Sequence, residues 1–70
     1  MQAFYRTEAE AVADAQRSRM DVSLCVISIE NAEGDTVYRI CEEWYLDTDE
    51  FVCFDGVLLG TFHPDGSFDI

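Results

Sequence analysis

Apolar and polar residues alternate with two different periods along this chain. Between residues 7 and 20 the apolar residues recur at intervals of three and four, which is the spacing of one helix face. Thr7-Glu8-Ala9-Glu10 has the form of a capping box, in which Thr7 accepts from the third helical amide and Glu10 reaches back. We therefore predict a helix from Thr7 to about Met20. Its predicted buried stripe consists of Ala9, Val12, Ala13, Gln16 and Met20.

From Val22 onward the period changes to two, as in strands whose faces differ in burial. In the segment 24–30, alternate residues from Cys25 to Ile29 fall on one apolar face, and residues 31–35 have turn chemistry. Residues 36–46 are predicted to form one long strand, with Trp44 on its core side and Tyr45 on its exposed side. Glu42 interrupts the apolar side, which indicates a bulge or a strand end there.

The C-terminal third is predicted to form a hairpin. Asp55-Gly56 suits a type I′ turn, so residues 51–54 and 57–62 are predicted to pair with each other. Gly60 is a predicted bulge or site of close approach, and Phe68 is predicted to pack back onto the body. Residues 1–70 thus form one α+β domain, with one N-terminal helix packed on a three- to five-stranded antiparallel meander.

Charge narrows the classes of partner. Fifteen acids face four arginines and no lysine, so the formal net charge is −11. Nucleic acid and anionic membrane surfaces both require a basic face, and direct binding to either is disfavoured. Such an excess keeps a protein soluble and steers cationic partners towards it. It is also compatible with salt adaptation or solubility alone.

The acids are concentrated in the second half of the chain, where residues 42–55 hold six acids and no base. Acids two apart on a strand would stand about 6.6–6.8 Å apart, close to two phosphate steps of about 3.4 Å along one DNA strand. We therefore predict a partner-binding surface that includes Tyr45 as an exposed anchor. Its predicted residues are Glu30, Glu33, Asp35, Glu42, Glu43, Tyr45, Asp47, Asp49, Glu50 and Asp55.

Other chemistry finds little support in the sequence. Cys25, Cys41, Cys53 and His63 could supply a Cys₃His zinc set, but they lack the close pairs of structural zinc sites. The segment that opens at Asp47 lacks the glycine and glutamate of an EF-hand calcium loop. The single histidine precedes a proline in a turn, and no serine or cysteine lies near it in sequence. We expect no enzyme activity, no metal and no cofactor. Three cysteines without a CxxC pair favour reduced thiols in the cytoplasm.

A short, lysine-free, acidic α+β domain with an acid run from Glu42 to Asp55 resembles the small phage-encoded inhibitors of bacterial defence, notably anti-CRISPR proteins and other DNA mimics. The resemblance implies a cytoplasmic inhibitor in a bacterial host cell. It would bind the basic DNA-binding channel of a CRISPR effector complex, or of a comparable nuclease, and block target DNA.

An alternative is a small protein-interaction module or a homodimer, in which acidity serves only solubility or salt adaptation. Its contacts would be apolar and would involve Phe4, Tyr5, Phe62 and Phe68 as exposed residues. Strand 57–62 would be the edge at which such a homodimer completes its sheet.

Overall fold

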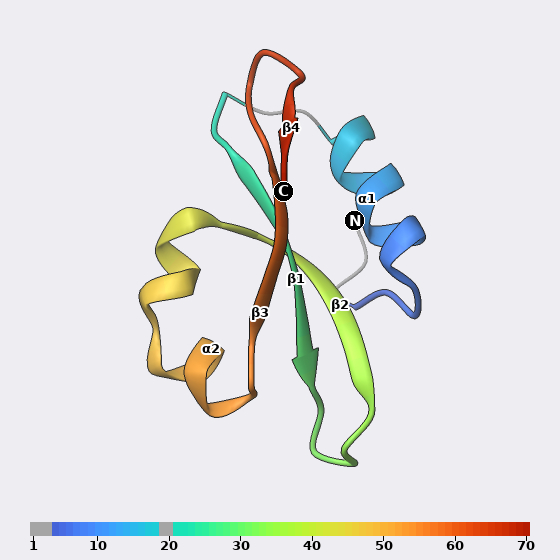
Figure 1. Cartoon of the computed structure of the whole chain (residues 1–70), viewed down its shortest axis with the longest axis vertical. Coiled ribbons are helices and arrows are strands. Elements are labelled where there is room, and N and C mark those ends of the chain that lie inside the picture. The colour runs from blue at the N-terminus through green and yellow to red at the C-terminus, as the bar shows by residue number, and fades with distance from the viewer. Residues whose placement is uncertain (1–3, 19–20) are drawn as a thin grey trace.

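The computed structural model describes residues 4–18 and 21–70. It confirms an α+β fold with an N-terminal helix and a four-stranded antiparallel sheet (Figure 1). The elements in chain order are α1 (Glu8–Arg17), β1 (Leu24–Glu30), β2 (Thr36–Glu42), the 3₁₀-helix η1 (Glu43–Asp47), α2 (Asp49–Cys53), β3 (Val57–Phe62) and β4 (Phe68–Asp69).

Helix α1 begins where the capping box predicts. The Thr7 hydroxyl accepts a hydrogen bond from the backbone N–H of Glu10 at 3.2 Å, which satisfies one of the free amides of the first turn. The helix ends at Arg17, with Ser18 as its C-cap, and is therefore shorter than predicted. Residue 20, the predicted end, lies outside the described residues.

The prediction of which face of this helix is buried is wrong, because the helix is rotated about its axis relative to the predicted orientation. Ala11 and Ala15 are fully buried, and Val12 is partly buried. By contrast, three predicted members are exposed: Ala9, Ala13 and Gln16. Alternating alanines place small apolar side chains on every face, so the pattern leaves the rotation of the helix undetermined. Contacts with Tyr5 fix the rotation of the helix, because the Tyr5 hydroxyl donates to the Asp14 carboxylate and the Tyr5 ring packs against the buried alanines.

The strand order is β2-β1-β3-β4, so β1 lies inside the sheet. The β1–β2 hairpin forms as predicted, and its turn is held by the Asn31 side chain, which accepts from the amides of Glu33 and Asp35. The sequential order of a meander is not found after that point. Strand β3 instead pairs with β1, on the side away from β2, although β2 precedes it in the sequence.

Residues 43–46 and 51–53 are helical where strands were predicted. Strand β2 ends at Glu42, the position where the sequence indicated an interruption, and the backbone continues as η1 and α2. Thr48 starts α2, because its hydroxyl accepts from the Phe51 amide at 3.3 Å. The Asp55-Gly56 turn therefore connects α2 to β3, and no hairpin joins residues 51–54 to residues 57–62.

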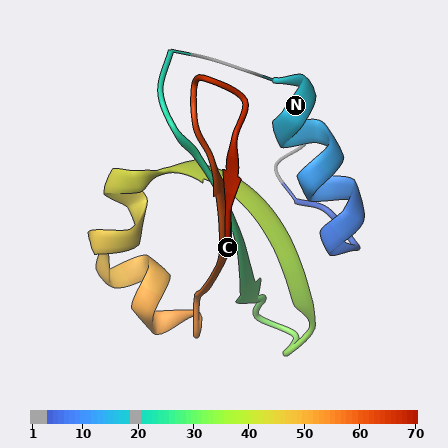
Figure 2. The same ribbon diagram turned by 45° about the horizontal axis from the view of Figure 1, so that its top comes forward.

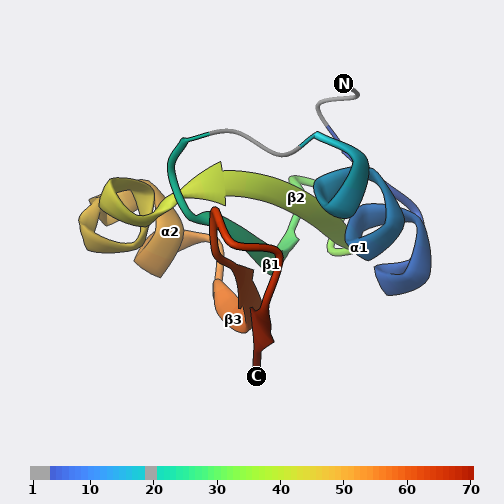
Figure 3. The same cartoon turned by 90° about the horizontal axis from the view of Figure 1, so that it is seen from above.

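The sheet is covered on both faces, with α1 on one side and η1–α2 on the other (Figures 2 and 3). Val26 faces α1, whereas Cys25, Ile27 and Ile29 face the η1–α2 side. This alternation confirms the predicted faces of β1. It also explains why nearly all of β1 is buried, since a central strand with two covered faces has no side open to water.

The C-terminal hairpin agrees with the prediction for Gly60 and Phe68. An irregularity in the β1–β3 pairing leaves Leu59 as an extra residue beside Gly60, which is a β-bulge. A Cβ atom at Gly60 would lie 2.3 Å from Cζ of Phe68, so the ring needs a glycine beneath it. Phe68 also packs on Phe62, with their ring centroids 4.3 Å apart.

Candidate partner-binding surface

Residues 42–55 form a lobe that carries the acids without a base, and we call it the acidic lobe. It comprises the end of β2, then η1 and α2, and the turn before β3, and it covers one side of the sheet (Figure 1). All six of its acids are exposed: Glu42, Glu43, Asp47, Asp49, Glu50 and Asp55. The structure therefore places these six predicted residues on the surface of one contiguous lobe.

The other three predicted acids lie at the end of the sheet formed by the β1–β2 hairpin: Glu30, Glu33 and Asp35. In the register of this hairpin Leu24 faces Glu42 and Glu30 faces Thr36, so Glu42 and Glu30 are six residues apart along the strand direction. That separation is roughly 20 Å at about 3.3 Å per residue. The two groups approach each other at Glu50, which shares a pocket with Glu30.

The expected match to phosphate spacing does not hold in the acidic lobe. Glu43 to Asp47 lie on a 3₁₀-helix, and Asp49 and Glu50 lie in the first turn of α2. Helical backbone rises by about 1.5–2.0 Å per residue and rotates successive side chains around an axis. The acids therefore form a patch rather than a row with the 6.6–6.8 Å spacing of a strand.

Tyr45 is not an exposed anchor, because it is 6% exposed and packs from η1 against Ile27 and Ile29 of β1. Its hydroxyl accepts a hydrogen bond from Nη1 of Arg39 at 3.1 Å. The Arg39 guanidinium carbon lies 5.0 Å from the Tyr45 ring centroid and 5.4 Å from that of Phe4. Burial, and next the Glu50 carboxylate, raise the pKa of Tyr45, and Arg39 opposes them.

Arg39 is thus held inside the fold rather than displayed among the acids. It is the single base between Glu30 and Asp55 in the sequence, and its side chain is 27% exposed. Its nearest carboxylate oxygen in the lobe, Oε1 of Glu50, is 3.9 Å away. Within residues 4–18 and 21–70, the remaining acids of the lobe form no ion pair with a base.

Exposed apolar residues lie among these acids. Trp44, predicted to be core, is 64% exposed, and Val52 and Phe54 are exposed as well. The change from strand to 3₁₀-helix at Glu43 reverses the expected faces, so that Tyr45 turns inward and Trp44 outward. The interruption at Glu42 was the only sequence signal of this exchange.

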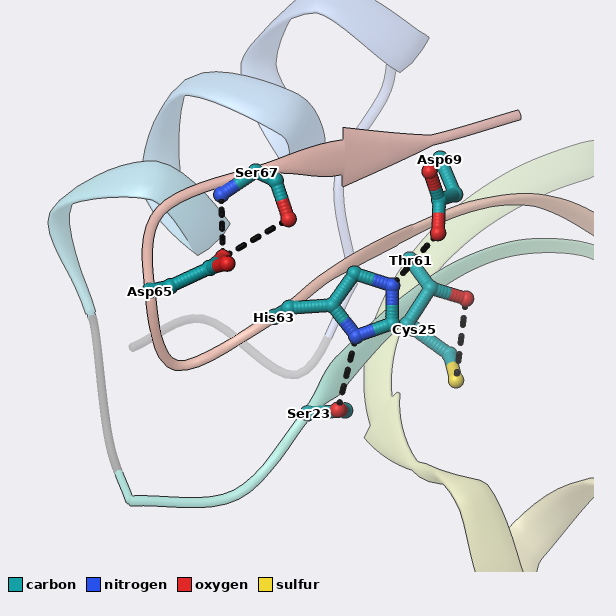
Figure 4. Close-up of polar contacts among 7 residues, drawn as sticks. All are labelled: Ser23, Cys25, Thr61, His63, Asp65, Ser67 and Asp69. Atoms are coloured by element: carbon teal, nitrogen blue, oxygen red, sulfur yellow. Dashed lines mark hydrogen bonds and ion pairs between the residues drawn. The ribbon is translucent and has the colours of Figure 1, made fainter.

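A hydrogen-bonded chain of Ser23, His63 and Asp69 was missed by sequence reasoning (Figure 4). Oγ of Ser23 lies 3.3 Å from Nδ1 of His63, and Nε2 lies 2.7 Å from the Asp69 carboxylate. Serine and histidine are 40 residues apart, so only the pairing of β1 with β3 brings them together.

These residue types could in principle activate a serine, but acyl transfer also requires donors that stabilise an oxyanion. The pocket beside Ser23 is lined instead by Glu42 and Glu43, whose carboxylates would oppose an oxyanion. The chain of hydrogen bonds fastens the β3–β4 turn to the residue that precedes β1. In the same turn, Ser67 donates to Asp65 and lowers the pKa of that carboxyl (Figure 4).

Two of the three cysteines are neighbours in the sheet, and the third lies apart from them. Cys25 and Cys41 face each other across β1 and β2, whereas Cys53 is exposed on α2. Burial raises the pKa of Cys25, and it raises that of Cys41 to about 12. Among the residues that the structure describes, no three or more metal-ligating side chains come together as a site for an ion.

Comparisons with protein-family models, with curated proteins and with solved structures find no match. No helix in the described ranges has both the length and the hydropathy that crossing a membrane requires. The functional proposal therefore rests on the charge, exposure and packing of the acidic lobe.

Proposed function

We propose that this protein is a non-enzymatic acidic binding protein that occupies the basic nucleic-acid-binding surface of a partner and excludes nucleic acid from it. The observation that carries the proposal is the acidic lobe, in which six exposed acids stand within fourteen residues without a base. A positively charged groove attracts such a surface over several ångströms and associates with it at an increased rate.

The lobe also has the composition of an interface rather than of a purely solvated edge. Aromatic residues that fill a desolvated centre provide most of the binding energy in typical interfaces, and charges around them provide orientation and rate. In this lobe Trp44, Val52 and Phe54 are the exposed apolar residues, and acids surround them in the sequence. Arg39 is held by Tyr45 and Phe4, and Glu50 is the one acid of the lobe with which it forms an ion pair among the described residues.

The class of partner follows from the resemblance to anti-CRISPR proteins and other DNA mimics. It implies a cytoplasmic inhibitor that acts in a bacterial cell on a CRISPR effector complex or a comparable DNA-binding nuclease. The channel of such an effector holds nucleic acid mainly through its backbone charge. A compact acidic lobe can compete for that channel without any reading of sequence.

The test is displacement of a fluorescent DNA duplex from a panel of purified CRISPR effector complexes and other DNA-binding nucleases. A variant that reverses Glu42, Glu43, Asp49 and Glu50 to lysine should lose the displacement that the unaltered protein shows. The matched control reverses four exposed acids that lie outside the lobe and outside the predicted binding surface: Glu8, Glu10, Asp21 and Asp69. Each reversal adds two charges, so both variants have a net charge of −3 instead of −11.

Circular dichroism and thermal melting check that both variants fold. Displacement should also weaken steeply as salt rises from about 0.05 to 0.3 M, because surface charges are screened over a Debye length of about 10 Å at 0.1 M. Equal displacement by the lobe variant and the unaltered protein would refute the proposal. Equal loss in both variants would show that overall charge matters and the lobe does not.

One observation favours the alternative of an apolar interaction module or homodimer. Strand β4 pairs with β3 at Thr61 and Phe62. In the part of the chain that the structure describes, no strand pairs with the outer edge of β3 before these residues, where Val57 and Leu58 are exposed. Most of the apolar residues predicted to make contacts in this alternative are not exposed. Tyr5 is buried, and Phe62 and Phe68 are packed against the core, which leaves Phe4 as the exposed member. Association that is insensitive to salt and is disrupted by Leu58→Lys would support this alternative.

A further inference from the structure

A pocket of about 310 Å³ lies where the approach to β1 meets the end of β2 and the start of η1. Its lining residues are Val22, Ser23, Glu42, Glu43 and Trp44. The hairpin register explains how they meet. Leu24 faces Glu42 across the two strands, so the residues just before Leu24 and just after Glu42 flank the same opening.

The indole of Trp44 is held in place although it is 64% exposed. Its Nε1–H donates to Oε2 of Glu42 at 2.8 Å. Its ring meets that of Tyr45 edge to face, with 6.2 Å between centroids and 76° between planes. A large aromatic surface that is already oriented loses little conformational freedom when a ligand stacks on it.

The pocket's chemistry selects a cation with an apolar stem. Tryptophan has the strongest attraction for cations among aromatic side chains, and two carboxylates stand beside it. Val22 supplies an apolar wall for methylene groups. The carboxylates repel anionic ligands. The volume is at the lower end of the range of about 300–1,000 Å³ for small-molecule sites, which suits a single long side chain.

We propose that this pocket binds an arginine side chain of the basic partner, with the guanidinium over Trp44 and directed towards Glu42 and Glu43. The inference rests on the proposed function, because it names the anchor through which the acidic lobe engages a basic surface. Arginine is preferred because its planar guanidinium both stacks on an aromatic face and forms paired hydrogen bonds with a carboxylate.

The protein contains an internal example of this arrangement. The guanidinium carbon of Arg39 lies 5.0 Å from the Tyr45 ring centroid, and an Oε1 atom of Glu50 lies 3.9 Å from its Nη1. An aromatic ring and a carboxylate of the acidic lobe, those of Tyr45 and Glu50, thus hold an arginine of strand β2. The Trp44 pocket offers the same pair of groups, a ring and a carboxylate, with space for an arginine from another molecule.

The test uses the single tryptophan of the chain as its reporter. N-acetyl-arginine amide is titrated into the unaltered protein, and the Trp44 emission and the NMR signal of the indole N–H are followed at constant ionic strength. N-acetyl-citrulline amide has nearly the same shape without the charge and is the matched probe. We expect saturable changes with the arginine probe at millimolar concentration, and none that saturate with citrulline.

Variants then locate the site. Glu42→Gln and Glu43→Gln should each weaken the arginine probe by about two- to fivefold, the usual effect of one exposed charge pair. The double variant should lose saturable binding. Glu10→Gln, on α1 at the opposite face of the sheet, should bind like the unaltered protein. Glutamine at position 42 can still accept from the indole, so the ring stays oriented, and melting curves verify the fold.

Equal responses to arginine and citrulline, or unchanged arginine binding by the double variant, would overturn the proposal. No saturable response to arginine would overturn it as well. These outcomes are separate from a failure of the proposed function, because the titration needs no partner. If the arginine probe did not bind but the protein still displaced DNA, the arginine pocket would be refuted and the acidic lobe would remain the proposed binding surface. Arginine binding without displacement of DNA from any partner would leave the pocket and refute the function.

Discussion

Arg39→Met is the substitution that most directly tests how the acidic lobe is built. It removes the hydrogen bond to the buried Tyr45 hydroxyl, which keeps the Glu50 carboxylate as a second partner. One such hydrogen bond contributes a net of about 0.5–1.5 kcal/mol. The two cation–π contacts with Phe4 and Tyr45 contribute about 0.5–1 kcal/mol each at partly exposed positions. The ion pair with the exposed Glu50, at 3.9 Å, adds about 0–1 kcal/mol.

The expected loss in the free energy of unfolding, the sum of these contributions, is therefore about 1.5–4.5 kcal/mol. A chain of this length has a total stability of roughly 3.5–10 kcal/mol, so the loss is a large fraction. Equilibrium unfolding in urea, followed by far-ultraviolet circular dichroism and by the emission of Trp44, measures it. Tyr45→Phe and the double variant complete a cycle, which should give a coupling of about 1 kcal/mol between the two side chains.

Arg17→Met is the matched control, because Arg17 is 74% exposed and pairs with Asp14 on the surface of α1. It should destabilise the protein by about 0.5 kcal/mol or less. If Arg39→Met had no larger effect than this control, and the cycle showed no coupling, Arg39 would be an ordinary surface charge. The reasoning that it is withdrawn from the lobe would then be refuted.

Two further predictions concern individual side chains. Ellman's reagent should label Cys53 rapidly in the folded protein because it is exposed. It should label Cys41 slowly, because this thiol is half-buried and has a raised pKa, and it should reach the buried Cys25 only on unfolding. Equally fast labelling of all three cysteines would contradict this order. Hydrogen bonds from Tyr5 and then Arg17 lower the pKa of Asp14 below 3.8, so the stability it contributes is present above that pH and is lost as the pH falls through the folded pKa. Asp14→Asn should therefore lower the free energy of unfolding at neutral pH, with a difference that narrows in acid. Denaturation series at several pH values measure that difference, and one that stayed constant with pH would contradict the assignment.

Local interactions account for what the sequence alone determined correctly. The start of α1 depends on one side chain and an amide three residues away, so the motif at Thr7 was sufficient. The alternation in β1 and the turn chemistry at Asn31 are equally local, and both predicted faces and the hairpin were confirmed. The acid excess of the segment 42–55 is a property of composition and is also independent of the fold.

Tertiary structure decided which partners these segments meet. Alternation assigns residues to two faces but does not determine which strands are neighbours. Strand β3 lies beside β1, with which it pairs, and not beside β2. The preference for a strand depends on packing against neighbours. Residues 43–47 and 49–53 instead fold as two short helices over the apolar face of Ile27 and Ile29. That single change buries Tyr45 and exposes Trp44. The charge of the binding surface could thus be predicted from the sequence, whereas its shape and its anchor arise from contacts between residues distant along the chain.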